Sequence, residues 1–272
     1  MRVAASPWVV SDELWELVEP LLPKPKRRAR YPGRKRLCDR EALSGILFVL
    51  YTGTAWMHLP QELGFGSGIT CWRRLDEWQR AGVWERLHVL LLSRLRAADQ
   101  IEWSRAVVDS SQIQAKKGGS ATGPSPVDRG RAGSKHHLLT DAHGTPLAWS
   151  VTGSNRNDIT QLVPLLDRVP AVAGRPGRPR QRPASVLGDR GYDSNSHRQI
   201  LRQRGIRPVI AYRYHEHGSG LGRYRWVVER TFSWLHQMKR LLVRYERRAD
   251  MHEAFLALGC CLICLRRLNN SF

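Results

Sequence analysis

The chain has 272 residues, with 44 Lys or Arg against 24 Asp or Glu, which gives a formal net charge of +20 at pH 7. Its first seven residues lack the apolar run of a secretory signal, and its longest apolar stretch, 254–265, is shorter than the ~18 residues that a membrane-spanning helix needs. We therefore expect a cytoplasmic protein that binds no membrane and whose partner is a polyanion, with nucleic acid favoured over the alternative that the charge serves only solubility.

Residues 1–100 predict an all-helical region. Ser11 is expected to cap a helix that Pro23 ends, and Asp39 to cap a second helix that runs to Tyr51. Between them lies a basic arm, residues 24–36, which cannot pack a core. This arm is either a solvated linker or a segment that follows phosphates.

Residues 40–80 predict a helix-turn-helix segment. After a turn rich in glycine, Thr70 is expected to open a helix that Ala81 ends, and Arg73 and Arg74 lie in its first turns. The second helix of such a pair enters the major groove of DNA by its N-terminal residues, so we expect both arginines to contact DNA. Small helical bundles share this pattern, and a plain packing helix is the alternative. With the basic arm, the segment favours a DNA-binding region over residues 1–100.

Residues 101–272 predict an α/β domain, because the apolar period shortens to that of strands. Three short strands come first, the last two joined by a hairpin turn, and then strands alternate with helices. The predicted strands are 105–110, 135–140, 146–151, 185–187 and 206–210; the predicted helices are 158–169, 194–204, a long helix 224–245, and a last helix that buries Cys261 and Cys264.

Three carboxylates stand out against this basic chain. Asp109 and Asp189 each follow an apolar run typical of a buried strand, and Glu229 lies in the long helix, on the side that carries Arg225. Taken alone, the helix favours a solvated acid paired with arginine; the two aspartates argue for a shared site. Mg²⁺ prefers hard oxygen ligands, and two ions can neutralise a phosphate and stabilise both the attacking and the leaving oxygen. We therefore predict that Asp109, Asp189 and Glu229 are catalytic and hold Mg²⁺ or Mn²⁺, two ions in all.

The same residues resemble a known family. Residues 108–110, 188–193 and 225–232 are similar to the three catalytic blocks of the DDE transposases of bacterial insertion elements, in the group named after insertion sequences four and five. Further similar blocks extend the resemblance over nearly the whole chain. It implies an RNase H-like catalytic core, with a mixed sheet flanked by helices, after an N-terminal region that binds the terminal inverted repeats. The implied reaction is metal-dependent DNA strand nicking by water, then strand transfer by the freed 3′-hydroxyl.

The family's signature around the glutamate is Tyr-x2-Arg-x3-Glu-x6-Lys. Arg225 and Glu229 fit it, whereas Gly222 stands at the Tyr position and His236 at the Lys position. The resemblance implies a homo-oligomer assembled on double-stranded DNA in the nucleoid. The alternatives are a DNA-binding relic or repressor that cleaves nothing, and a general nuclease or RNA-binding protein. Besides Arg73 and Arg74, we expect DNA contacts from Lys135, Arg225, His236 and Arg240.

Overall fold

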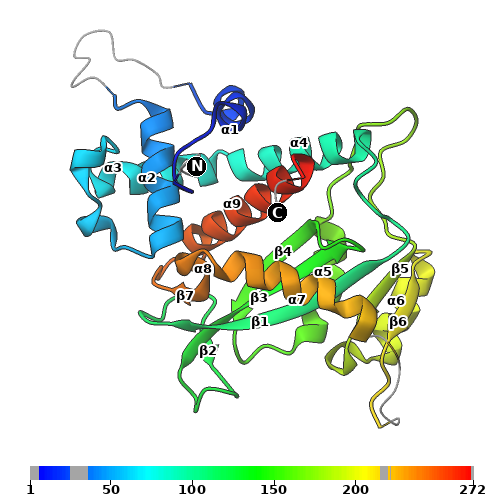
Figure 1. The fold of residues 1–272 in the computed structure, drawn as a ribbon. Helices are drawn as coiled ribbons and strands as arrows, with labels where there is room; N and C mark the ends of the chain where they lie inside the picture. The colour runs from blue at the N-terminus through cyan, green and yellow to red at the C-terminus, as the bar shows by residue number, and fades with distance from the viewer. Residues whose placement is uncertain (1–5, 25–35, 215–219, 221, 271–272) are drawn as a thin grey trace.

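Figure 1 shows a computed structural model of the chain, which describes residues 6–24, 36–214, 220 and 222–270. A group of helices at the N-terminal end of the chain lies beside a mixed sheet that carries helices of its own. The basic arm falls largely outside the described residues. The N-terminal elements are α1 (Asp12–Val18), η1 (Glu19–Leu21), α2 (Asp39–Thr52), η2 (Trp56–His58), η3 (Gln61–Leu63), α3 (Gly68–Arg80) and α4 (Val83–Ala97).

The predicted helix starts agree with the structure to within a few residues. The Ser11 cap is confirmed, since its hydroxyl accepts a hydrogen bond from the N–H of Leu14 at 3.2 Å. By contrast, α3 begins at Gly68 rather than Thr70, because Ser67 is its cap. A Cβ at Gly68 would lie 1.7 Å from the carbonyl oxygen of Trp56, so only glycine permits this close approach of α3 to η2.

The five predicted strands form a sheet with the directions that the sequence predicts, and two short strands that were not predicted, β2 and β7, pair with β3 and β1. The path of the sheet runs β2-β3-β1-β5-β6, with β4 also paired to β3. β3 and β4 join β1 as an antiparallel meander, while β5 and β6 run parallel to β1. This is the RNase H-like arrangement, with helices on the sheet's faces (Figure 1). The strands are β1 (Ala106–Ala115), β2 (Gly123–Pro124), β3 (Ala132–Asp141), β4 (Pro146–Gly153), β5 (Ser185–Gly188), β6 (Arg207–Ile210) and β7 (Val243–Arg244).

β1 is longer than the predicted strand 105–110. Its pairing with β3 continues through Gln114 opposite Gly133, so Asp109 lies inside the strand and not at its end. The polar run that follows Asp109 suggested a strand end. The strand continues because its backbone hydrogen bonds to β3 do not depend on whether the side chains are polar.

The predicted helix 224–245 is wrong. The chain instead forms α7 (Gly222–His236), a short α8 (Lys239–Leu242) and β7. At Met238 the backbone is extended, with φ −84° and ψ 105°, and this residue is buried. The bend lets Met238 and Leu241 pack closely against Gly259, where a Cβ would lie 2.8 Å from Leu241. The remaining helices are η4 (Asp158–Gln161), α5 (Leu162–Arg168), η5 (Arg190–Tyr192), α6 (Asn195–Gln203) and α9 (Ala249–Leu268).

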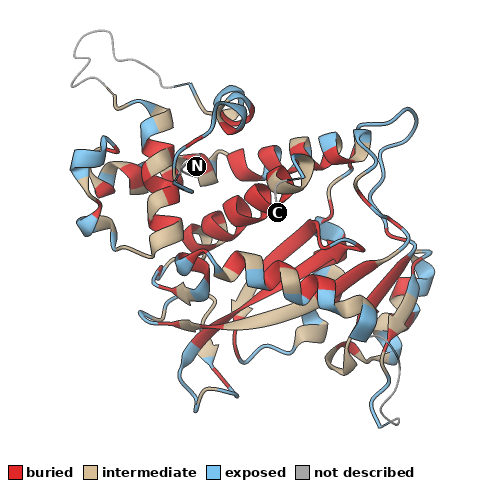
Figure 2. Cartoon of the chain, viewed as in Figure 1, coloured by how far each residue is buried: buried red, intermediate tan, exposed pale blue. Residues whose placement is uncertain are grey.

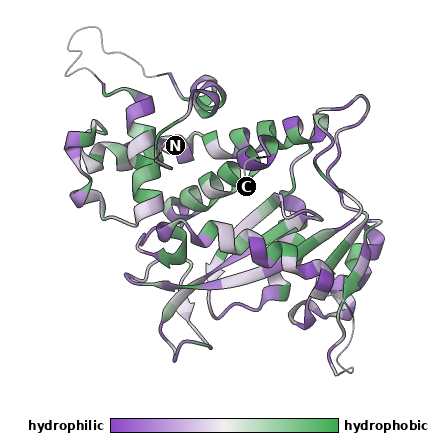
Figure 3. Ribbon diagram, in the orientation of Figure 1, coloured by the Kyte–Doolittle hydropathy of each residue, from purple (hydrophilic) through white to green (hydrophobic). Residues whose placement is uncertain are grey.

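Helices from both ends of the chain share one hydrophobic core with the sheet. α9 packs against α4 and α3, and its Cys261 and Cys264 are buried, as predicted. Figure 2 shows buried residues through much of α4, α9, β3 and β4, and Figure 3 shows apolar residues along α4 and α9. In the part of the chain that the structure describes, none of the helices combines the length and the apolar character needed to cross a membrane.

Candidate active site

Asp109 and Asp189 lie side by side because their strands are parallel neighbours. β1 pairs with β5 at Ala106 opposite Val186 and Val107 opposite Leu187. Continuing that register by two residues brings Asp109 level with Asp189, just beyond the last residue of β5. The predicted convergence of these two acids therefore follows from the strand order.

Gly188 and the turn after it fix the Asp189 carboxylate. A Cβ on Gly188 would lie 3.2 Å from both Tyr192 and Val108, so a larger residue would push β5 away from β1. Oδ1 of Asp189 accepts a hydrogen bond from the N–H of Gly191 at 2.8 Å, which caps η5. The glycines of this segment thus keep the two strands close and orient the acid.

Helix α7 lies beside the two aspartates and contributes Arg225 and Glu229. Nη2 of Arg225 lies 3.2 Å from Oδ2 of Asp109 and 3.8 Å from Oδ2 of Asp189. Glu229, one helical turn later, is exposed and lines an open cleft with Asp109. We call this the carboxylate cleft; its volume is about 590 Å³ and its lining is Asp109, Ser110, Ser111, Glu229, Phe232, Ser233, His236, Gln237 and Lys239.

The electrostatics of Asp109 reflect this crowding. The pKa of the Asp109 carboxyl is raised to about 6, chiefly by burial and to a smaller extent by the nearby charges of Asp189 and Glu229. The N–H of Ser110 and the guanidinium of Arg225 oppose the shift, because both favour the ionised form. The charges of Asp189 and Glu229 therefore act on Asp109, and a cation near the three carboxylates would reduce their mutual repulsion.

The donor set fits a hard divalent cation, since it offers carboxylate oxygens in a cleft open to solvent. Among the described residues, no three His, Cys, Asp or Glu side chains lie near enough together to hold one ion as they stand. Arg225 explains this spacing, because its guanidinium takes the place of a cation between the two aspartates. A cation bound at these residues would compete with Arg225 for the same carboxylate oxygens.

The two arginines of α3 differ in their surroundings. Arg73 is exposed, whereas the Arg74 side chain is only 12% exposed and lies 2.9 Å from Asp39 and 3.2 Å from Glu77. Arg74 therefore links α3 to α2 through these ion pairs, and its DNA contact stays a prediction. The helical spacing of the two residues could not reveal this, because the acid on α2 is distant in sequence.

Lys135 and Arg240 are also paired with acids of the protein. Nζ of Lys135, a buried residue, lies 2.8 Å from Oδ1 of Asp158. Arg240 is buried with Nε 3.2 Å from Oε1 of Glu246, because the bend after α7 turns it inward. The DNA contacts of both residues stay predictions, and in the structure each residue is held in an ion pair.

His236 lines the carboxylate cleft, and burial lowers the pKa of its imidazole. Lys239 lines the same cleft, is exposed, and was not expected from the sequence. In a continuous helix Lys239 would lie three residues, or most of a turn, past His236. Residues three apart are neighbours on a helix face, and with the bend at Met238 both residues still line the cleft, so a lysine lies there although the family's Lys position holds His236.

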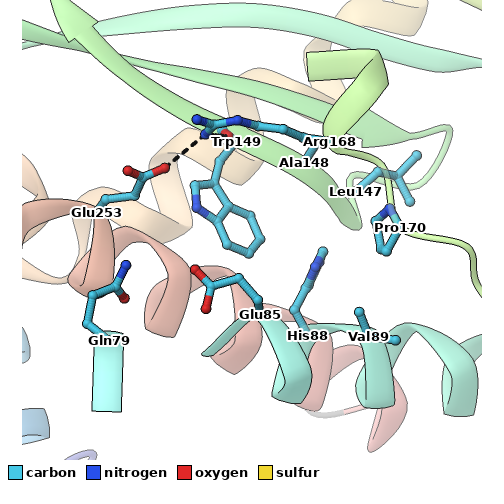
Figure 4. Close-up of a pocket in the computed structure, with 10 residues that line it drawn as sticks. All are labelled: Gln79, Glu85, His88, Val89, Leu147, Ala148, Trp149, Arg168, Pro170 and Glu253. Atoms are coloured by element: carbon cyan, nitrogen blue, oxygen red, sulfur yellow. Dashed lines mark hydrogen bonds and ion pairs between the residues drawn. The ribbon is translucent and has the colours of Figure 1, made fainter. Parts of the chain in front are cut away.

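Another cavity, of about 280 Å³, lies between α4, α9 and β4 and is lined by none of the three acids (Figure 4). His88 is fully buried at its wall, and its Nε2 lies 2.8 Å from the carbonyl oxygen of Pro146. The charged groups around it are Glu85 and the ion pair of Arg168 with Glu253. The pKa of His88 is lowered to about 4, because burial lowers it by more than the hydrogen bond with the Pro146 carbonyl raises it.

His88 makes the folded protein sensitive to acid. Its pKa is lower in the fold than in the unfolded chain, so the stability it contributes is present above pH ~6.5 and lost as the pH falls towards 4. A fall from 6.5 to about 4 corresponds to about 3 kcal/mol over that window. We expect His88→Gln to lose less stability than the wild type between pH 7.5 and pH 4.5 in urea unfolding. Equal losses in the two proteins would contradict this assignment.

Comparison with known proteins gives consistent matches. Residues 10–88 match a family model described as "Putative transposase of IS4/5 family", and residues 104–265 match one described as "Transposase DDE domain". In Burkholderia cepacia, the "Putative transposase for insertion sequence element IS402" is 60% identical over 170 residues, which are 61% of this chain and 79% of that protein. The "Insertion element IS402 uncharacterized 16.2 kDa protein" of the same organism is 61% identical over 119 residues, 43% of this chain and 81% of that protein.

Solved structures are more distant. The catalytic domain of Mos1 mariner transposase has a TM-score of 0.28 at 11% identity, over 69% of this chain and 91% of that chain. A chain in the structure of the simian T-cell lymphotropic virus intasome with PP2A regulatory subunit B56 gamma has a TM-score of 0.33 at 15% identity, over 57% of this chain and 48% of that chain.

The sheet order and its helices define the class: a protein with an RNase H-like domain that follows an N-terminal helical region. The family model over residues 104–265 covers more than half of the chain, and the match to the IS402 protein extends over most of that relative. The chain belongs to the DDE transposases of insertion elements, in the IS4/5 family.

Proposed function

We propose that this transposase binds the terminal inverted repeats of its insertion element, nicks a DNA strand there and joins the freed 3′-hydroxyl to target DNA. The observation that supports the proposal is that Asp109 of β1 and Glu229 of α7 line one cleft, while Arg225 of α7 contacts both Asp109 and Asp189, in a chain of net charge +20. Acids that converge on a basic surface suit a phosphodiester substrate, because the surrounding charge attracts the DNA that the acids alone would repel.

Asp109, Asp189 and Glu229 would hold the divalent cations, Mg²⁺ or Mn²⁺ and two in number. When bound, the cations neutralise the phosphate and make water or a 3′-hydroxyl a stronger nucleophile. Arg225 can donate two hydrogen bonds to a phosphate group if its guanidinium releases part of its contact with Asp109 and Asp189. Lys239, exposed at the cleft, can donate to the next phosphate along the strand. No side chain of the cleft needs to act as a covalent nucleophile.

The direct test is to incubate the purified protein with its own flanking genomic DNA and Mg²⁺ and to map the nicks. The proposal expects nicks at the ends of the element, and a homo-oligomer that forms on those ends. A catalytically inactive relic or repressor would bind the ends without nicking them. A general nuclease would cut with no preference for the terminal sequence.

Arg73 and Arg74 offer a matched test of DNA reading by α3. Arg73→Ala is expected to weaken binding of the element ends by about 1–3 kcal/mol, because an exposed arginine in a major groove contacts base edges. Arg74→Ala is expected to lower the free energy of unfolding instead, because it removes the ion pairs of Arg74 with Asp39 and Glu77 and leaves only Arg36, among the described residues, to pair with these two acids. Fluorescence anisotropy at fixed salt measures the first effect and urea unfolding the second. If Arg73→Ala binds the ends as the wild type does, α3 is a packing helix.

A further inference from the structure

A cavity of about 540 Å³ opens beside α8, and we call it the α8 cavity. Its walls come from η2, the first turns of α3, α8 and the segment between β7 and α9. This volume lies within the range of roughly 300–1,000 Å³ in which small-molecule sites fall. Lys239 lines the carboxylate cleft and the next residue, Arg240, lines the α8 cavity, so one short helix separates the two.

Three aromatic rings line the α8 cavity, and each is held on one side by the protein. Trp56 stacks on Phe255, with ring centroids 5.8 Å apart and planes 15° apart. The guanidinium of Arg248 lies 5.7 Å from the Trp72 ring, and that of Arg240 lies 4.9 Å from the Tyr245 ring. Fixed aromatic rings are platforms for nucleobases, since every base has a π-face to stack on them.

The charge of the α8 cavity favours a strand of nucleic acid over a second copy of the protein. Lys117 and Arg247 line it and are exposed, and neither has an acidic partner among the described residues. Glu246 is the acid of its lining, and this carboxylate is buried and paired with Arg240. A second copy would bring its own net charge of +20 to the same cations, whereas phosphates would neutralise them.

We propose that the α8 cavity binds unpaired nucleotides of the DNA strand that passes through the carboxylate cleft. The bases stack on Trp72 and Tyr245, and Lys117 and Arg247 neutralise their phosphates. The inference rests on the proposed function in one respect, that the substrate is DNA. The short length of α8, four residues, means that a strand leaving the cleft reaches the cavity within a few nucleotides.

The test compares two labelled duplexes without metal: a blunt one and the same duplex with a single-stranded tail of about four thymidines. The wild type is expected to bind the tailed duplex about tenfold more tightly, because each stacked base adds affinity. Tyr245→Ala removes a stacking ring and Met57→Glu places an anion at the cavity mouth. Each is expected to cut the preference to about twofold or less and to leave blunt binding unchanged. The matched control is Val127→Glu, since Val127 is 77% exposed, Met57 is 84% exposed, and Val127 lies outside the cavity.

The outcomes separate the inference from the proposed function. Equal binding of both duplexes by the wild type overturns the inference, and so does an undiminished tail preference in Met57→Glu, which is too exposed to unfold the protein. If Met57→Glu instead dissociates an oligomer in sedimentation and keeps the tail preference, the cavity is an interface between copies. A tail preference without any Mg²⁺-dependent nicking leaves the α8 cavity as assigned and overturns the transposase chemistry.

Discussion

Asp109→Asn is expected to abolish nicking and strand transfer, by more than about a thousandfold, and to leave DNA binding intact. Asparagine keeps the shape of the side chain but removes the charge that holds a cation against the phosphate. The basic surface that attracts DNA is unchanged. The measurement is Mg²⁺-dependent cleavage of a duplex that contains an element end, with binding measured in Ca²⁺.

The control for this prediction is Asp128→Asn, the same chemical change in a loop, where Asp128 lies 3.7 Å from Arg131. It is expected to cleave as the wild type does. Asp109→Asn is also expected to fold at least as stably as the wild type, because burial raises the pKa of Asp109 to about 6 and makes its ionised form the less stable one in the fold. Full cleavage by Asp109→Asn would remove Asp109 from the site.

Trp84→Ala is expected to destabilise the whole protein by about 3–5 kcal/mol, because it leaves a large cavity in the core. Trp84 on α4 is fully buried, packs edge-on against Trp78 with ring centroids 6.0 Å apart, and contacts Cys261 of α9 through its carbonyl oxygen. It therefore joins the N-terminal helices to the last helix. A shared core predicts one unfolding transition in the variant, at lower urea than in the wild type.

Calorimetry and urea unfolding check this prediction, with Trp226→Ala as the matched control. Trp226 is 49% exposed on α7, so its loss is expected to cost less than about 1 kcal/mol. Two separate transitions in Trp84→Ala, with the sheet unfolding as in the wild type, would mean that the helices form a core of their own.

Much of the fold follows from local patterns in the sequence. The cap at Ser11, the turn between β3 and β4 and the alternation of strands with helices after Asp158 all depend on neighbouring residues, and the structure has them. The bend at Met238 does not, because it depends on the closeness of Gly259, twenty-one residues later. A continuous apolar stripe cannot distinguish one long helix from two that turn around the same core.

The candidate site divides in the same way. Acids at matching register positions of two parallel neighbouring strands lie side by side, so the nearness of Asp109 and Asp189 could be predicted from the sequence, although Asp109 lies inside β1 and not at its end. The partners of Lys135 and Arg240 could not, because Asp158 and Glu246 reach them only through the fold. A basic residue near a motif can pair with an acid that the sequence alone does not place beside it, as Lys135 and Arg240 do.

The central claim, that three acids act as one site, is tested most directly by comparing Asp189→Asn, Glu229→Gln and the double variant in Mg²⁺-dependent cleavage and joining of an element end. When metal ligands act as a unit, removing any one of them abolishes nearly all of the catalytic activity. We therefore predict that each single variant is inactive in both steps and that the double variant is no worse than the singles. Cleavage and joining by Glu229→Gln at the wild-type rate would contradict the account and leave Glu229 as a solvated acid of α7.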